Sequence, residues 1–268
     1  MTAAQLARQI FLKKTMLCVG LDTDYLRLPS VYRETPTALG MFDFNRVIID
    51  ATAPYCVAYK PNLAFYEVLG SQGMRVLEMT VDYIRSKHPD HFIIADAKRG
   101  DIGNTAKMYA ETYFKSFDVD AVTLSPYMGR DTVLPFLEYP GKFAVVVALS
   151  SNASSSDYQT ADPSMPLYKK VIRDMLEIST PDNMMFVVGA TKAEKLREIR
   201  ELAPDNFYLV PGVGAQGGSA EEVIRCGANA MGGLLINSSR AILYASSGPD
   251  FDEAAARAAS QTARLDQI

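Results

Sequence analysis

Short apolar runs along the chain alternate with longer stretches in which apolar residues recur every three or four positions. A short apolar run bounded by charged or turn-forming residues is typical of a buried strand. A spacing of three and four indicates a helix with one buried face. Eight runs fit the first description: residues 16–21, 56–59, 92–95, 121–124, 143–149, 185–188, 207–210 and 230–236. We therefore predict eight strands.

Helical patterns separate most of these runs. Apolar residues have the helical spacing in 74–84 and 106–117, and a capping-box pattern that opens a helix occurs at 191–194 and 219–222. Strands that alternate with helices form parallel βαβ units. Eight such units predict an α/β fold, a (β/α)8 TIM barrel, with residues 1–268 as a single catalytic domain. A doubly wound open sheet is the alternative, but no G-x-G-x-x-G follows the first run.

Three further segments are expected around the barrel. Residues 1–14 are amphipathic, which predicts an N-terminal helix. The polar segments 22–39 and 150–166 follow the first and fifth runs, and loops in those places lie on the face where barrels carry active sites. We predict that these two insertions act as lids, with ordinary surface loops as the alternative.

Composition and charge limit the classes of partner. A chain of 268 residues suits one barrel, for which about 250 residues is typical. The formal net charge of −4 argues against a nucleic-acid-binding protein. Charges interrupt residues 1–14, unlike a signal peptide, and no run approaches the roughly 20 apolar residues of a membrane helix. We expect neither nucleic acid nor a membrane as partner.

Cysteine and histidine usage narrows the chemistry. Cys18, Cys56 and Cys226 are widely spaced and odd in number, which is typical of a cytoplasmic protein without a disulfide framework. The only histidines, His88 and His91, flank one loop. A histidine triad or a zinc site is therefore not expected, and we predict that the protein holds no metal.

The most informative motif is the run from Asp96 to Asp101, directly after the third apolar run. Side chains at i and i+2 of a strand share a face, so Asp96 and Lys98 should point to one side. Gly100 permits a turn through which Asp101 could fold back toward them. Close charges shift one another's pKa values, as active sites require. The alternative is an exposed strand end with an ordinary ion pair.

Other polar residues follow the remaining strands and should converge on the same face of the barrel. Lys60 follows the second run, where a buried lysine is costly unless it is paired; a lysine that snorkels to the rim is the alternative. Asp22 follows the first run, and a turn cap is its alternative role. Ser151 and Asn152 follow the fifth.

A glycine-rich segment, residues 210–218, follows the seventh run. Its backbone N–H groups can converge on an anion, aided by the N-terminus of the next helix. Arg240 follows the eighth run and can grip phosphate through its planar guanidinium. Loops seven and eight are the usual phosphate site of such barrels, so we predict one here. An ordinary turn is the alternative.

Together these motifs resemble those of the orotidine 5'-phosphate decarboxylases, over residues 17–240. The signature Asp96-x-Lys98-x-x-Asp101 continues as Asp-Ile-x-x-Thr105, and residues 211–218 resemble the phosphate loop of the family. Residues 122–136 and Ser151-Asn152 are similar to the longer bacterial subgroup, although residues 148–150 depart from its Arg/Lys-Thr-Ser-Asn pattern.

The resemblance implies that orotidine 5'-monophosphate is decarboxylated to UMP, the last step of de novo UMP biosynthesis, without a cofactor. It implies a catalytic tetrad of Lys60, Asp96, Lys98 and Asp101, with Lys98 as the proton donor to C6 of the pyrimidine. It also implies a homodimer in which Asp101 and Thr105 enter the site of the neighbouring subunit. The remaining implied contacts are Asp22, Thr105 and Lys60 to the ribose, Ser151 and Asn152 to the pyrimidine, and Gly212, Gln216, Gly217, Ser239 and Arg240 to the phosphate.

Two other functions remain open at this point. Sugar-phosphate decarboxylases or aldolases of the same superfamily share the Asp-x-Lys-x-x-Asp run but depend on a metal, with an acidic residue where this chain has Lys60. The second alternative is a non-catalytic phosphate-binding barrel. An unused cluster of four charges would cost stability, which argues against that alternative.

Overall fold

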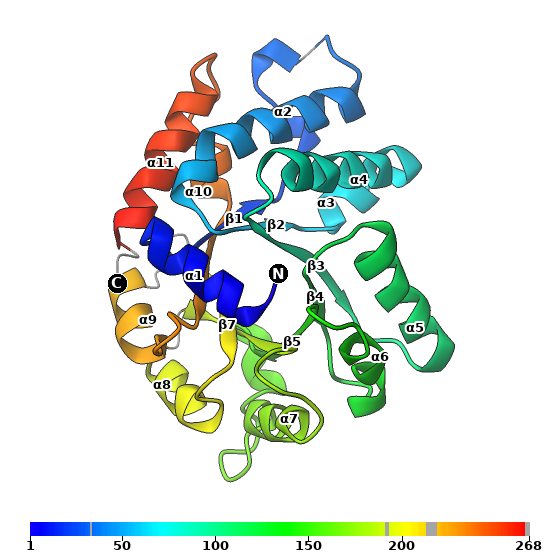
Figure 1. The fold of residues 1–268 in the computed structure, drawn as a ribbon, viewed down its shortest axis with the longest axis vertical. Coiled ribbons are helices and arrows are strands. Elements are labelled where there is room, and N and C mark those ends of the chain that lie inside the picture. Colours follow the sequence, from blue (N-terminus) through cyan, green and yellow to red (C-terminus); the bar gives the residue numbers. More distant parts are fainter. Residues whose placement is uncertain (33, 191–192, 213–218, 266–268) are drawn as a thin grey trace.

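A closed barrel of eight parallel strands forms the centre of the computed structural model, and each strand pairs with its neighbours in sequence order (Figure 1). The structure describes residues 1–32, 34–190, 193–212 and 219–265. The predicted (β/α)8 barrel is therefore confirmed. Its strands are β1 Leu17–Leu21, β2 Ala58–Pro61, β3 Phe92–Arg99, β4 Ala121–Leu124, β5 Phe143–Leu149, β6 Met184–Val188, β7 Phe207–Pro211 and β8 Leu234–Ser238.

Helices surround the barrel and connect its strands (Figure 1). A π-helical turn, Thr112–Ser116, continues α5. None of the helices in the described part of the chain has the length and apolar character needed to cross a membrane. The helices are α1 Ala3–Lys13, α2 Thr37–Thr52, α3 Ala64–Glu67, α4 Gly70–Lys87, α5 Gly103–Glu111, α6 Leu134–Leu137, α7 Leu167–Leu176, α8 Ala193–Leu202, α9 Ala220–Gly227, α10 Arg240–Leu243 and α11 Phe251–Leu265.

Several strands extend beyond the apolar runs that predicted them. The run 92–95 predicted only half of β3, which continues through charged residues to Arg99. The run 56–59 is displaced by two residues from β2. The run 230–236 begins four residues before β8 and ends two residues before the end of that strand, and residues 229–232 form a hydrogen-bonded turn instead of strand. Apolar character marks the part of a strand inside the barrel, whereas polar residues occupy its mouth. The predicted cap Ser219 does accept from Glu222 N, and residues 191 and 192 lie outside the described residues.

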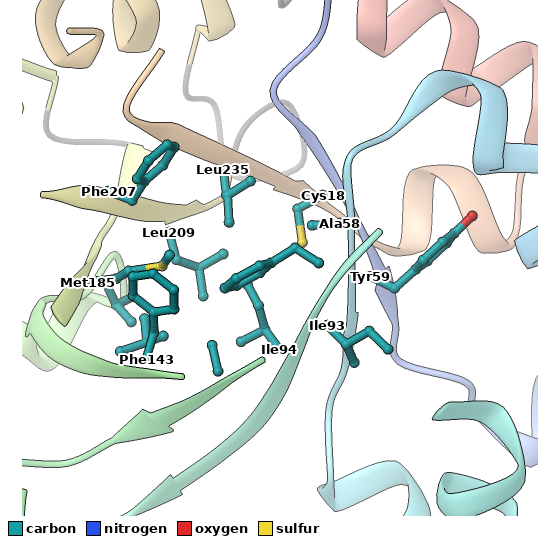
Figure 2. Close-up of a cluster of buried hydrophobic side chains, with 14 of the residues drawn as sticks. Cys18, Ala58, Tyr59, Ile93, Ile94, Phe143, Met185, Phe207, Leu209 and Leu235 are labelled. Atoms are coloured by element: carbon teal, nitrogen blue, oxygen red, sulfur yellow. The ribbon is translucent and has the colours of Figure 1, made fainter. Parts of the chain in front are cut away.

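The barrel interior is filled by alternate side chains of the strands (Figure 2). All the labelled residues are buried; Cys18, Ala58 and Ile94 lie on the inner side of their strands, whereas Tyr59 and Ile93 point to the other side (Figure 2). The hydroxyl of Tyr59 donates to the Ile49 carbonyl of α2, at 2.8 Å. The interior is therefore a packed core on which the polar mouth rests.

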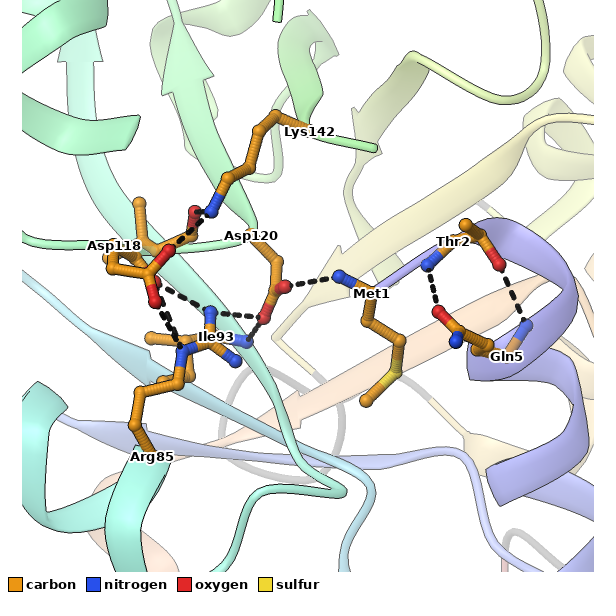
Figure 3. Close-up of polar contacts among 9 residues, drawn as sticks. Met1, Thr2, Gln5, Arg85, Ile93, Asp118, Asp120 and Lys142 are labelled. Atoms are coloured by element: carbon orange, nitrogen blue, oxygen red, sulfur yellow. Dashed lines mark hydrogen bonds and ion pairs between the residues drawn. The ribbon is translucent and has the colours of Figure 1, made fainter. Parts of the chain in front are cut away.

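The opposite end of the barrel carries a buried carboxylate, that of Asp120 (Figure 3). It accepts from the Met1 ammonium at 2.6 Å and from Ile93 N at 2.8 Å, and it pairs with Arg85 at 2.9 Å. A buried carboxylate is tolerated when its oxygens are satisfied in this way. The contacts hold the predicted N-terminal helix, α1, and α4 to the floor of the barrel.

Candidate active site

A cavity of about 290 Å³ opens at the carboxyl ends of the strands, close to the lower end of the usual range for small-molecule sites. Polar groups from most of the strands meet there, with an apolar wall that includes Val147 and Val187. The sequence-predicted residues that line it are Asp22, Lys60, Asp96, Lys98, Ser151, Asn152, Gly212, Ser239 and Arg240.

Asp96 lies at the centre of a cluster of four charges. Its Oδ1 accepts from Lys98 Nζ at 2.6 Å, and its Oδ2 accepts from Lys60 Nζ at 3.0 Å. Lys60 Nζ also lies 3.6 Å from Asp22 Oδ1. The side chain of Lys60 is 4% exposed and that of Lys98 is 55% exposed. Lys60 is thus paired and buried rather than snorkelling, and Lys98 is the more exposed of the two lysines that line the cavity.

The cluster keeps two of its members, Asp96 and Lys60, charged. Burial by itself would raise the pKa of Asp96, but the ammonium groups of Lys60 and Lys98 outweigh it and hold that pKa well below its usual range. Burial would lower the pKa of Lys60, but Asp22 and Asp96 outweigh it and raise that pKa. Both pKa shifts favour the ionised form of the side chain at neutral pH. Fixed charges therefore lie beside the cavity and create a strong electrostatic field there.

An irregularity in β3 brings Asp96 and Lys98 to the cavity. Ala95 pairs with Val122 of β4, but the next paired residue of β3 is Arg99, which lies beside Leu124. Residues 96–98 therefore bulge opposite Thr123. Lys98 has a left-handed backbone, with φ of 48°. Simple strand alternation predicted the shared direction of the two side chains, but a bulge produces it.

Asp101 and Thr105 are not brought to this cavity by their own chain. Asp101 Oδ1 accepts from Ile102 N at 2.8 Å, and the ion pairs among the described residues include none of Asp101 with Lys60 or Lys98. Thr105 is exposed on α5. The structure therefore does not bring Asp101 to Lys98 within one chain, which continues from Asp101 into α5 at Gly103.

The loop after β5 is held against the cavity by its own polar contacts. Ser150 Oγ donates to Asn152 Oδ1 at 2.7 Å, and Gln159 binds both the backbone and the hydroxyl of Ser150 at 2.8 Å. A Cβ at Gly189 would lie 2.8 Å from Ser151 N, so the bare backbone of this glycine is what admits Ser151. The insertion 150–166 is thereby anchored beside the site at Ser150.

The other insertion, 22–39, contains two short 3-10 helices, Tyr25–Arg27 and Ser30–Tyr32. The hydroxyl of Tyr244 accepts from Asp24 N at 2.7 Å and donates to the carbonyl of Asp22 at 3.3 Å. This insertion is therefore tied to the end of α10, and Asp22 enters the site from it.

The predicted phosphate end of the cavity is lined by Gly212, Ser239 and Arg240. Arg240 is exposed at the start of α10 and forms no ion pair with a carboxylate of the described residues, which leaves its guanidinium available. Gln216 and Gly217 lie outside the described residues.

Sequence reasoning missed several other residues that line the cavity, among them Asn237 and Thr123. Asn237 of β8 has its buried Oδ1 without a hydrogen-bond partner in the described structure. Thr123 of β4 donates to Asp96 Oδ1 at 3.0 Å. Thr123 follows apolar neighbours in a buried strand, where threonine is an ordinary residue, so the sequence carried no signal for it.

A sequence model of the "Orotidine 5'-phosphate decarboxylase / HUMPS family" matches residues 15–258. The chain belongs to this family. Curated relatives named orotidine 5'-phosphate decarboxylase include those of Phocaeicola vulgatus, 50% identical over 100% of this chain and 99% of the relative, and Porphyromonas gingivalis, 52% identical over 99% and 95%. These bacterial relatives confirm the resemblance and the carboxy-lyase class.

Solved structures of orotidine 5'-phosphate decarboxylases have the same barrel. A putative decarboxylase from Toxoplasma gondii has a TM-score of 0.84 with 37% identity and covers 98% of both chains. The decarboxylase of Leishmania donovani has a TM-score of 0.83 with 32% identity and covers 100% of both. The similarity therefore extends over the whole fold.

Proposed function

We propose that the protein decarboxylates orotidine 5'-monophosphate to UMP with Lys98 as the proton donor and without a cofactor. The bond between C6 and the carboxylate carbon breaks, CO₂ leaves, and the electron pair stays at C6. The proton of Lys98 then forms the new C–H bond, and the amine regains a proton from water. The observation that carries this proposal is the Lys60–Asp96–Lys98 chain of ion pairs at the cavity.

The difficulty of the reaction is the negative charge at C6, which has no neighbouring electron sink. A fixed ammonium aimed at the place where charge develops stabilises it without reorganisation. Asp96, held ionised by two lysines, accepts a hydrogen bond from Lys98 Nζ at 2.6 Å and so limits the direction of that ammonium. Lys60 is buried and stays in place, while the more exposed Lys98 is free to approach the substrate.

The other contacts follow from the lining of the cavity. We propose that Asp22 and Lys60 bind the ribose, that Ser151 and Asn152 bind the pyrimidine, and that Gly212, Gln216, Gly217, Ser239 and Arg240 bind the phosphate. The insertion 150–166 starts at the pyrimidine side, so its closure over the substrate would exclude water from the reacting carbon.

We also propose a homodimer in which Asp101 and Thr105 complete the site of the partner subunit. Exposed apolar side chains surround the exit of β3 and β4: Ile102, Met108, Tyr127, Met128 and Leu134. Tyr127 is 82% exposed, and α5 contacts α6 beside it. Such a concentration of exposed apolar residues is typical of a protein interface, and a second copy seated there would cover it.

Activity should persist without any metal ion, because Lys60 occupies the place where the metal-dependent sugar-phosphate enzymes have an acidic residue. Among the residues that the structure describes, no three metal-ligating side chains of His, Cys, Asp and Glu gather. We expect decarboxylation of orotidine 5'-monophosphate to be unchanged after exhaustive chelation. Loss of turnover that Mg²⁺ restores would favour the metal-dependent alternative, and absence of turnover with and without Mg²⁺ would favour the non-catalytic barrel.

Arg240→Ala should lower kcat/KM for orotidine 5'-monophosphate by a factor that corresponds to about 2–4 kcal/mol of transition-state stabilisation, because a charge-assisted contact with the phosphate is lost. The same change should matter little for orotidine, which lacks the phosphate, and the double cycle of variant against substrate isolates the contact. Arg75→Ala, which removes a surface arginine paired with Glu78, serves as the control. Equal losses with both substrates would assign Arg240 to the fold or the base pocket.

A further inference from the structure

The bulge at residues 96–98 of β3 combines an unfavourable backbone conformation with two charged residues of the site. Ala95 pairs with Val122 of β4, and Arg99 pairs with Leu124. Three residues of β3 therefore lie opposite a single residue of β4, an excess of two. The bulge takes Lys98 out of the regular ladder, and its φ of 48° is unfavourable for a residue with a Cβ. Such a conformation persists only where its surroundings hold it.

The hydroxyl of Thr123 satisfies the backbone that the bulge releases. Lys98 N donates to Thr123 Oγ1 at 2.9 Å, and Thr123 Oγ1 donates to Asp96 Oδ1 at 3.0 Å. The direction of both bonds is fixed by the partners, because an amide N–H can only donate and an ionised carboxylate can only accept. Thr123 itself is 1% exposed.

One hydroxyl therefore joins the main chain of Lys98 to the carboxylate that aims the ammonium of Lys98. Asp96 has three side-chain donors, of which Lys60 and Thr123 are buried and fixed. Without Thr123, Oδ1 would be oriented by Lys98 alone, whose side chain is half exposed. The two buried donors, Lys60 and Thr123, thus fix the orientation of the Asp96 carboxylate, and that carboxylate orients the Lys98 ammonium.

We propose that Thr123 is a positioning residue for the reaction: its hydroxyl locks the β3 bulge so that Asp96 and Lys98 are presented to the substrate in register. The proposal rests on the proposed decarboxylation. Its effect should appear in the chemical step and not in binding, because Thr123 acts through the groups that meet the developing charge.

The test compares Thr123→Val, which nearly keeps the shape, with Thr123→Ser, which keeps the hydroxyl. For Thr123→Val we expect kcat and the single-turnover rate to fall about 10- to 100-fold, with KM and the affinity for UMP within about threefold of wild type. Thr123→Ser should stay within about threefold of wild type in all four quantities. Thr52→Val is the control, since it removes a buried hydroxyl that donates to Ile48 O outside the site; it should alter Tm and leave kcat unchanged.

Several results would overturn the proposal. A kcat of Thr123→Val near that of wild type, equal kcat values for the Ser and Val variants, or a rise in KM alone would each remove the positioning role. Should the Val variant not fold, Thr123→Ala carries the same expectation, and failure of both to fold would mean a purely structural hydroxyl. Wild-type protein without turnover would instead overturn the proposed function, and with it this inference.

Discussion

Replacing Lys98 with alanine is expected to abolish decarboxylation while the barrel stays folded. Lys98 is more than half exposed, so its side chain contributes little packing, and its ammonium is the donor that we assign to C6. The loss leaves Asp96 with Lys60 and Thr123 as partners, so no buried charge is orphaned. Turnover should be measured together with Tm, which should change little.

The matched control for this variant is Lys170→Ala, which removes an exposed lysine that pairs with Asp174 across one turn of α7. That change should leave kcat as it is. The assigned role is wrong, and another group supplies the proton, if Lys98→Ala keeps more than about a tenth of wild-type kcat. Such a loss would correspond to an increase of less than roughly 1.4 kcal/mol in the activation barrier.

Mixing two inactive variants, Lys98→Ala and Asp101→Ala, is expected to restore activity. Asp101 is not among the residues that line the cavity of its own chain, and its neighbour in sequence, Ile102, is an exposed apolar residue. If Asp101 completes the site of the partner subunit, a mixed dimer contains one site with both residues intact. At full exchange half of the dimers would be mixed, each with one such site, so about a quarter of the wild-type activity is the expected recovery.

Subunit exchange must be shown in the same mixture, for example with differently labelled chains. A mixture of Lys98→Ala and Asp96→Ala provides the control, because both residues belong to one cavity and no mixed dimer would contain an intact site. No recovery in the first mixture, despite confirmed exchange, would place Asp101 in the site of its own chain.

The sequence predicted the barrel well because each strand has a buried apolar segment. The bounds of β4 and β5 agree with their apolar runs, since both strands are largely buried and Thr123 is their single polar residue. The prediction was poorest for β3, where half of the strand is polar because it lines the cavity. Hydrophobicity therefore locates the interior of the barrel and not its functional end.

The convergence of the site residues could also be predicted, because it follows from the topology of the barrel. Parallel strands bring their carboxyl ends to one face, so Asp22, Lys60 and Arg240 meet although they are far apart in sequence. The contacts that depend on register could not be predicted. The partnership of Thr123 with Asp96 needs the bulge, and a bulge has no signature in a single sequence.

The two-residue excess of β3 also constrains how the length of this segment can change. Side chains alternate between the two faces of a strand. Because the number of extra residues is even, Arg99 lies on the same face as Ala95. Inserting or deleting one residue between these positions would turn Arg99, the last residue of the strand, to the wrong side. Within residues 96–98 the same change would also alter the direction of Lys98 relative to Asp96. A change of length at this point is therefore expected to disrupt the charge cluster as surely as a change in its charged residues, whereas loops that carry no site residue should tolerate insertions better.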